Sequence, residues 1–326
     1  MKHVSILIPL GNSSISHIES TYRILSHVNG ILSDRKKHPL FDIQLVGLSM
    51  PASDMGNRFA AKPDVLISDV NKTELIIIPA MIGNPNDSIA LNQELIPWIR
   101  QQRESGAEVA SFCIGAFFLA ATGLLKGKKC STHWFSAAEF RNMFPDVNLM
   151  DDKIMTEDDG IYTSGGANSY LNLLVHLVEK FVTRDVAILI AKIYMIDIDL
   201  ISQSPFIVFQ GQKDHGDEAI KKAQTFIESN FQKKITVDQL TNMLALSRRS
   251  LERRFKQATS NTVIEYLQRV KIEAAKKEFE SSWKNINEVM YDVGYTDTKG
   301  FRTVFKKVAG ISPTEYRNKY NKLIAI

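Results

Sequence analysis

Residues 286–313 read INEVMYDVGYTDTKGFRTVFKKVAGISP, and this stretch decides the fold of the C-terminal third of the chain. Its apolar residues recur at helical spacing on both sides of Gly294, which stands where a left-handed helix end needs glycine. Asp297 is suited to cap a second helix that runs to Val308. Two short helices joined by a tight turn form a helix-turn-helix unit, and the stretch predicts one.

The same shape occurs once more upstream. Thr236 and Ser247 are suited to cap two consecutive short helices. Leu251 and Phe255 are four residues apart, which places them on one inward face of the second helix. Apolar residues in 217–326 show no alternation with a period of two, so we expect an all-α domain with two helix-turn-helix units.

Basic and polar side chains lie off the apolar stripe of the second helix in each unit. Such cations suit phosphates, and the forked donors of arginine also suit guanine edges. A solvated helical face is the alternative interpretation, but two such helices inside one repeated motif favour DNA binding. The candidate DNA-binding residues are Arg248, Arg249, Arg253, Lys256, Thr298, Lys299, Arg302 and Lys306.

Length and charge point to a second domain before this one. The chain of 326 residues exceeds the roughly 250–300 residues at which a single core stops growing. Residues 1–212 hold 18 Lys and Arg against 22 Asp and Glu, a net charge of −4, whereas residues 213–326 hold 22 against 14, a net charge of +8. Charge alone fits binding to nucleic acid or to a membrane surface equally well.

Through residue 180, short apolar segments alternate with helical patterns, as in a doubly wound, flavodoxin-like α/β sandwich. The segments expected to be strands buried on both faces are 4–9, 43–47, 75–79 and 109–112. We therefore expect an α/β domain over 1–200, a linker over 201–216 and the all-α domain over 217–326.

Cys113 lies in the segment VASFCIGA, residues 109–116, which is typical of a strand, a sharp turn and the start of a helix. This is the pattern of a nucleophile elbow, and a solvent-accessible thiol there has a lowered pKa. His133, twenty residues later, is a candidate base that reaches Cys113. Buried structural roles for Cys113 and His133 are the alternatives.

Composition and cysteine usage narrow the class of protein. Cys113 and Cys130 are too few for a disulfide framework or a structural zinc site, so we expect a reducing cytoplasm and no metal. The seven residues between His3 and Gly11 are too few for a signal peptide, and no stretch approaches 18 uncharged apolar residues. We therefore expect no membrane association and no cofactor.

Several residues of the basic region fit one known pattern. They are Gly294-Tyr295, Phe301, Phe305-Lys306, Gly310-Ile311-Ser312-Pro313 and Tyr316-Arg317, with Leu251, Arg254 and Phe255 upstream. The region resembles the DNA-binding domain of AraC/XylS-family transcription regulators. The resemblance implies one long helix, here about 264–279, that joins two units reading successive major grooves. Thr241 and Met290 replace small residues of that family, so we expect local repacking there.

The first domain has its own resemblance, carried by the Cys113 segment, by Ser131-Thr132-His133-Trp134 and by Thr163-Ser164-Gly165-Gly166. It resembles the PfpI-like domain of the class I glutamine amidotransferase-like superfamily, in the form fused to an AraC-type domain in GlxA-like regulators. Gln203 fits the arm of such regulators. Related enzymes add a carboxylate after the first strand, where this chain has His17, with Glu19 two residues later.

Together these patterns predict a cytoplasmic transcription regulator rather than an enzyme. Its α/β domain would sense an unknown small molecule and form a homodimer, with double-stranded DNA as partner and RNA polymerase as a candidate partner. The expected ligand pocket, at the carboxyl end of the sheet, comprises Glu19, Cys113, His133, Gly165 and Gly166. The alternatives are a thiol hydrolase or amidase using Cys113 and His133 beside an accessory DNA-binding domain, and redox sensing by Cys113.

Overall fold

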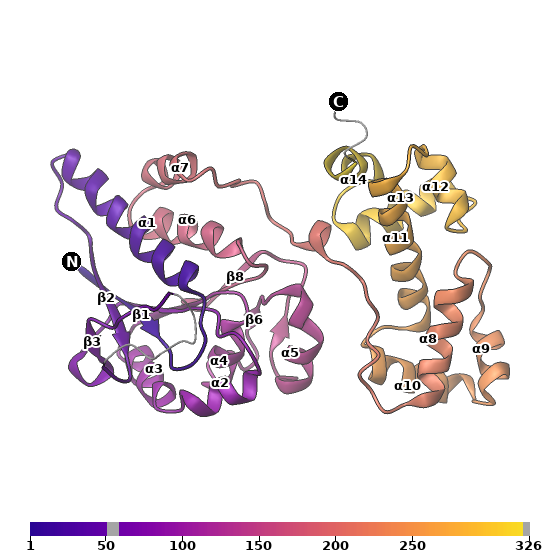
Figure 1. Ribbon diagram of the computed structural model, residues 1–326, viewed down its shortest axis with the longest axis horizontal. Coiled ribbons are helices and arrows are strands. Elements are labelled where there is room, and N and C mark those ends of the chain that lie inside the picture. The colour runs from indigo at the N-terminus through magenta and orange to yellow at the C-terminus, as the bar shows by residue number, and fades with distance from the viewer. Residues whose placement is uncertain (51–58, 322–326) are drawn as a thin grey trace. The chain divides into compact units, whose positions relative to one another are not determined.

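The computed structural model describes residues 1–50 and 59–321. The chain forms two compact units, Met1–Gln203 and Ser204–Ile326, which are taken in turn below (Figure 1). Residues 201–203 of the predicted linker therefore belong to the first unit and residues 204–216 to the second. Within the described residues, no helix is long and apolar enough to cross a membrane.

The first unit is built on a seven-stranded sheet. In spatial order its strands are β3 (Val65–Leu66), β2 (Phe41–Gly47), β1 (Lys2–Ile8), β4 (Leu75–Ile78), β5 (Glu108–Ser111), β9 (Ile161–Ser164) and β8 (Met155–Asp158). All neighbours pair in parallel except β8, which runs antiparallel to β9. A small second sheet pairs β6 (Lys129–Cys130) with β7 (Asn148–Leu149).

Helices cover both faces of this sheet, which confirms the predicted doubly wound α/β fold (Figure 1). One face packs against α1 (Ile15–Asp34), α6 (Ser169–Phe181) and α7 (Arg184–Ile193). The other packs against α2 (Pro85–Leu91), α3 (Leu95–Glu104), α4 (Gly115–Ala121) and α5 (Ala137–Met143). In β4, Leu75 and Ile77 enter the first core while Ile76 and Ile78 enter the second, because successive side chains of a strand point to opposite faces.

Helices are the regular elements of the second unit, and its described residues, 204–321, contain no strand. After the short 3-10 helix η3 (Ser204–Phe206) come α8 (Glu218–Asn230), α9 (Val237–Leu244), α10 (Arg248–Thr259), α11 (Val263–Ser281), α12 (Ile286–Asp292), α13 (Thr298–Ala309) and α14 (Pro313–Tyr320). One core joins α8, α9 and α10 to the start of α11, and a separate core joins the end of α11 to α12, α13 and α14. The predicted pair of helix-turn-helix units, α9–α10 and α12–α13, is confirmed.

The helix starts expected from the sequence are present. The side chains of Thr236, Ser247 and Asp297 accept hydrogen bonds from backbone amides in the first turns of α9, α10 and α13. Gly294, between α12 and α13, has φ +78°, and a Cβ atom there would lie 2.0 Å from the Gln232 carbonyl oxygen. Only glycine fits this turn, both by conformation and by space.

Candidate DNA interface and ligand site

Cys113 occupies the turn between β5 and α4 with φ +56°, a conformation uncommon for any residue but glycine. Its backbone amide donates to the carbonyl oxygen of Ser164 at 3.1 Å and lies 3.3 Å from the Ser164 hydroxyl. A Cβ atom on Gly115 would lie 2.6 Å from the Pro79 carbonyl oxygen, so the helix start packs directly on the neighbouring strand end. The backbone has the shape of a nucleophile elbow.

The Cys113 thiol is buried, and its pKa is raised. Only 8% of the residue is exposed, and burial raises the pKa of the thiol to about 11 against a smaller lowering by the Ile114 amide. A lowered pKa is expected only for a solvent-accessible thiol, and Cys113 does not meet that condition. The helix start is present, but desolvation outweighs it, and the thiol stays protonated at neutral pH.

His133 follows β6 and is half-buried, and burial lowers its pKa. Its Nδ1 atom accepts a hydrogen bond from the Phe135 amide at 3.1 Å. Within the described part of the chain no hydrogen bond joins the imidazole to the Cys113 thiol. The two segments meet instead through Thr132, whose hydroxyl donates to the Cys113 carbonyl oxygen at 3.0 Å.

His17 stands where related enzymes have a carboxylate, and it is 4% exposed. Its ring lies against Phe112 and Tyr170, with centroids 5.6 and 4.3 Å away. Nδ1 accepts from the Ala80 amide at 3.2 Å, so Nε2 is the atom that donates to the Ala167 carbonyl oxygen at 3.3 Å. Burial lowers the pKa of His17 to about 4, which keeps the ring neutral. Both ring nitrogens are therefore bonded to backbone groups rather than to a side chain that could act as a base.

Glu19 is placed away from this neighbourhood. Its side chain is exposed on α1 and pairs with Arg23, one helical turn later. The described polar contact of Glu19 is therefore with Arg23 and not with another residue expected in the pocket.

Gly165 and Gly166 follow β9, and Gln203 fills the space beside them. A Cβ atom on Gly165 would lie 2.6 Å from the Gln203 side-chain nitrogen. That nitrogen donates to the Thr132 and Lys153 carbonyl oxygens at 3.0 and 3.1 Å, and the Gln203 side-chain oxygen accepts from the Trp134 amide at 3.3 Å. Gln203 is 2% exposed. Sequence reasoning placed it in an arm and missed this buried anchoring role.

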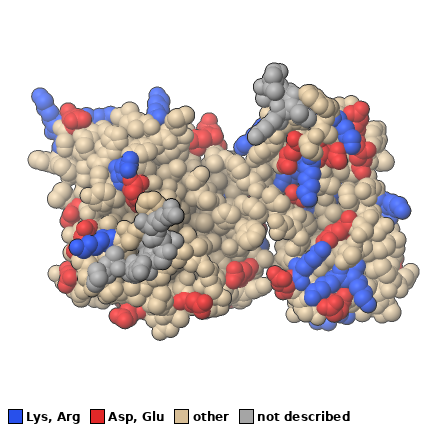
Figure 2. All heavy atoms as spheres, viewed as in Figure 1, with Lys and Arg blue, Asp and Glu red and all other residues tan. Residues whose placement is uncertain are grey.

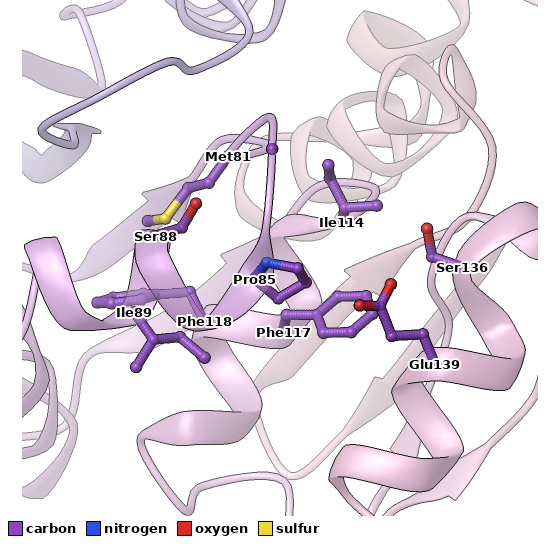
Figure 3. A pocket seen from close by; sticks show the side chains of 10 residues that line it. Met81, Pro85, Ser88, Ile89, Ile114, Phe117, Phe118, Ser136 and Glu139 are labelled. Carbon is purple, nitrogen blue, oxygen red and sulfur yellow. The ribbon is translucent and has the colours of Figure 1, made fainter. Parts of the chain in front are cut away.

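A cavity of about 40 Å³ lies between α2, α4 and α5 (Figure 3). It is lined by Met81, Gly83, Pro85, Ser88, Ile89, Ile114, Phe117, Phe118, Ser136 and Glu139. None of the five residues expected in the ligand pocket lines it, although Ile114 directly follows Cys113. Sequence reasoning missed this cavity; the usable signal was that Met81 and Gly83 follow the carboxyl end of a buried strand.

In the second unit, the candidate DNA-binding side chains face solvent. Leu251 and Phe255 of α10 are fully buried, as are Phe301 and Phe305 of α13, which confirms the inward faces expected from spacing. Seven of the eight candidates are exposed, and Thr298 is half-buried. Figure 2 shows Lys and Arg side chains gathered over the helices α8 to α10 on the face that it presents.

Two basic side chains of α10 are held by acidic neighbours in different ways. Arg248 pairs with Glu252 at 3.0 Å, and both are well exposed. Arg254 instead forms a two-pronged contact with Asp217, at 2.8 and 2.6 Å, and Asp217 also caps α8. Arg254 therefore fixes α10 to α8, while Arg248 is free to exchange an exposed partner for a phosphate.

Known families match both units. The model described as the DJ-1/PfpI family matches residues 40–180, and the one described as a helix-turn-helix domain matches residues 240–319. The chain joins a DJ-1/PfpI-family domain to an AraC-type helix-turn-helix domain. The expectation of a PfpI-like domain fused to an AraC-type domain is confirmed.

Curated relatives share this arrangement along most of the chain. The HTH-type transcriptional regulator GbdR of Pseudomonas aeruginosa is 23% identical over 309 residues, which cover 94% of this chain and 82% of GbdR. The HTH-type transcriptional regulator GlxA of Rhizobium meliloti is 21% identical over 222 residues, 68% of each protein.

Solved structures agree with the fold of the DJ-1/PfpI domain. An AraC family transcriptional regulator from Pseudomonas putida has a TM-score of 0.50 at 18% identity, covering 60% of this chain and all of that one. A DJ-1 superfamily protein from Salmonella typhimurium has a TM-score of 0.50 at 15% identity, covering 60% of this chain and 98% of that one. These likenesses concern the fold.

Proposed function

We propose that this protein is a transcription regulator that binds a specific DNA site through α10 and α13 and whose DJ-1/PfpI domain senses a small molecule without converting it. The observation that carries the proposal is the repeated pair of capped helices, each with a buried apolar face and exposed cations. The names of GbdR and GlxA, both HTH-type transcriptional regulators, support it.

The spacing of the two units supports contact with adjacent major grooves. They sit at opposite ends of α11, which has 19 residues and is therefore roughly 28 Å long at about 1.5 Å per residue. Adjacent major grooves on one side of B-DNA are roughly 34 Å apart. Each chain would then cover more than one turn of the duplex.

Selection of genomic fragments by the purified full chain, in the presence of competitor DNA, tests this function. We expect a small set of enriched fragments that share a sequence longer than one helical turn. Uniform recovery of all fragments would show that the basic unit binds DNA without sequence preference and would overturn the proposal.

The proposal assigns no reaction to Cys113. A protonated buried thiol, a neutral His17 in place of a carboxylate and a His133 bound to its own backbone together lack an activated nucleophile. Assays of the full chain and its Cys113→Ser variant against ester, amide and glyoxal substrates check this directly. Turnover that disappears in the variant would favour the thiol hydrolase instead.

We place the effector in the cavity beside Ile114. Its walls are mostly apolar, two serine hydroxyls face it, and Glu139 is the one charged residue that lines it. Figure 3 shows the Glu139 carboxylate directed toward the space beside Phe117. This lining suits a small neutral or cationic molecule and disfavours an anion. Occupancy by anything larger than a few water molecules requires α2 and α5 to separate.

We also propose that the chain is a homodimer, because two linked DNA-binding domains gain affinity through effective concentration. Sedimentation of the full chain at micromolar concentration measures the assembly. A species with the mass of one chain would contradict the dimer and leave DNA binding to the single chain.

A further inference from the structure

The segment that connects the two units is bound along its length to the second one. We call residues 204–212 the arm. Its first turn, η3, packs against α13, and the Pro205 carbonyl oxygen accepts from the Tyr320 hydroxyl of α14 at 3.3 Å. The ammonium group of Lys319 lies 4.5 Å from the centre of the Phe206 ring. The arm therefore begins on the second helix-turn-helix unit.

The backbone in the middle of the arm is hydrogen-bonded to a buried ion pair of α11. The side chains of Lys276 and Glu273 are 5% and 12% exposed, and their charged atoms lie 3.1 Å apart. Lys276 also donates to the Ile207 carbonyl oxygen, and Glu273 accepts from the Phe209 amide at 3.1 Å. Buried charges are tolerated only when their hydrogen-bonding groups are satisfied, and here the backbone of the arm satisfies them.

The far end of the arm packs on the core that α8 and the start of α11 share with the first helix-turn-helix unit. The Phe209 ring packs edge-on against Tyr266 with centroids 5.1 Å apart. The Gln212 carbonyl oxygen accepts from Gln224 of α8 at 2.7 Å, and Asn261, which follows α10, donates to the Gln212 side chain at 3.4 Å. A side chain at Gly211 would collide with the Tyr266 hydroxyl, 2.3 Å from the added Cβ.

The residue before the arm is held just as firmly in the DJ-1/PfpI domain. Gln203 is bound to the backbone at Thr132, Trp134 and Lys153, on either side of His133 and against Gly165. Chain positions 203 and 204 are consecutive and both are buried, Gln203 at 2% and Ser204 at 7% exposure. Gln203, which is bound in the first unit, is therefore followed directly by the first residue of the arm.

We infer that Gln203 and the arm form a connector that couples the segment around His133 to the relative placement of the two helix-turn-helix units. A shift of residues 132–134 would displace Gln203, and with it the arm. Displacement of the arm would change its contacts with α11 and so the positions of the two helix-turn-helix units. This coupling rests on the proposed function, since it gives the sensing domain a route to DNA affinity.

The first experiment needs no DNA and so stands apart from the proposed function. Hydrogen exchange is measured on the full chain and on Gln203→Ala, with Lys153→Ala as matched control, because the Lys153 side chain is exposed and only its backbone meets Gln203. We expect exchange at the Phe209 amide to quicken several-fold in Gln203→Ala alone. Unchanged exchange across the arm, with Gln203→Ala still folded, would overturn the coupling.

The second experiment asks whether the arm positions the two units. Phe209→Ala is compared with Val208→Ala, whose exposed side chain lies on the same arm, on a selected site that spans two major grooves and on the same site cut to one. We expect roughly a tenfold weaker affinity of Phe209→Ala for the long site and little change on the short one. Phe209→Tyr should restore binding to the long site.

Equal losses on both sites would mean that the arm contributes only to stability, and would overturn the positioning role. Failure of the wild-type chain to prefer any DNA would remove the proposed function and the positioning role with it. The exchange experiment would still decide whether the two domains are coupled.

Discussion

His17 shows how one buried side chain changes what the elbow can do. The ring is neutral because it lies between Phe112 and Tyr170 and both of its nitrogens are already bonded to backbone groups. A protonated imidazole at that place would lose hydration without gaining an acceptor in return, since Nδ1 faces an amide N–H. The elbow therefore keeps its backbone shape, with a neutral imidazole beside it.

The low pKa of His17 makes the stability of the first domain depend on pH. Its folded pKa of about 4 lies below the ordinary 6.5, so between these values the unfolded chain binds more protons and stability falls as pH decreases. We expect the free energy of unfolding to lose up to about 3 kcal/mol from this group between pH 6.5 and 4.

Urea unfolding of the wild type and of His17→Gln at pH 7 and pH 4.5 measures this contribution. The variant should lose less stability than the wild type on acidification, because glutamine does not titrate. Parallel losses in the two proteins would show that His17 is protonated in the folded state.

Arg302 is the residue at which base reading and phosphate binding can be separated. It is exposed on α13, off the inward face that carries the buried rings of Phe301 and Phe305. If it reads a guanine, Arg302→Ala should weaken binding by about 1–3 kcal/mol and relax preference at one base pair. Lys307→Ala removes the same charge from another side of α13 and is the control. Competition against all single-base variants of the site distinguishes the outcomes, and equal weakening at every variant would make Arg302 a phosphate contact.

At the scale of elements, the turn between α12 and α13 is more constrained than its counterpart between α9 and α10. The first turn uses Ala245 at φ +52°, which L residues tolerate with modest strain. The second uses Gly294, whose missing side chain leaves room for the Gln232 carbonyl oxygen. Only the second turn therefore depends on glycine for space.

Substitution of this glycine should destabilise the helix-turn-helix domain. We expect Gly294→Ala to lower the free energy of unfolding by at least about 3 kcal/mol. The φ angle is unfavourable for alanine, and the added methyl group also collides with the backbone. Gly216→Ala is the control, since its Cβ would meet nothing within 4 Å. Calorimetry of both variants should show a lower melting temperature only for Gly294→Ala, and equal melting temperatures would contradict the role of the turn.

Helix caps and periodicity allowed the helical elements to be predicted from local sequence. Thr236, Ser247 and Asp297 form their caps because the capping interaction lies within three residues of each. The pairing of Arg254 with Asp217 was out of reach, because 37 positions separate them. In the same way, nothing near Cys113 in the chain indicates that its thiol is desolvated.

At the scale of the whole molecule, sequence reasoning predicted both folds and placed the elbow, but it did not find the cavity or the anchor. The cavity combines strand ends with helices from three separate segments. Gln203 occupies the space beside Gly165 only because the chain returns there after 38 residues. Contacts between residues that are far apart in the chain can be found only in the three-dimensional structure.

The charge of the C-terminal region predicts a strong effect of salt on DNA binding. Residues 213–326 have a net charge of +8, and seven of the candidate side chains are cations. With roughly six phosphate contacts per chain, the logarithm of the association constant should fall against the logarithm of salt with a slope of about −5. Fluorescence anisotropy at salt concentrations from about 50 to about 200 mM measures the slope. A slope near zero would mean that these cations do not meet the phosphates.

The direct join between Gln203 and Ser204 also bears on how such a chain can be recombined. The arm shares a core with the helices that follow it, so an engineered sensor that borrows this DNA-binding domain should take it from Ser204 onward. A fusion point at residue 213 would leave the buried pair of Lys276 and Glu273 without its backbone partners. The position of the fusion point, rather than the length of any linker, would decide whether DNA binding by the fused domain responds to the new sensor domain.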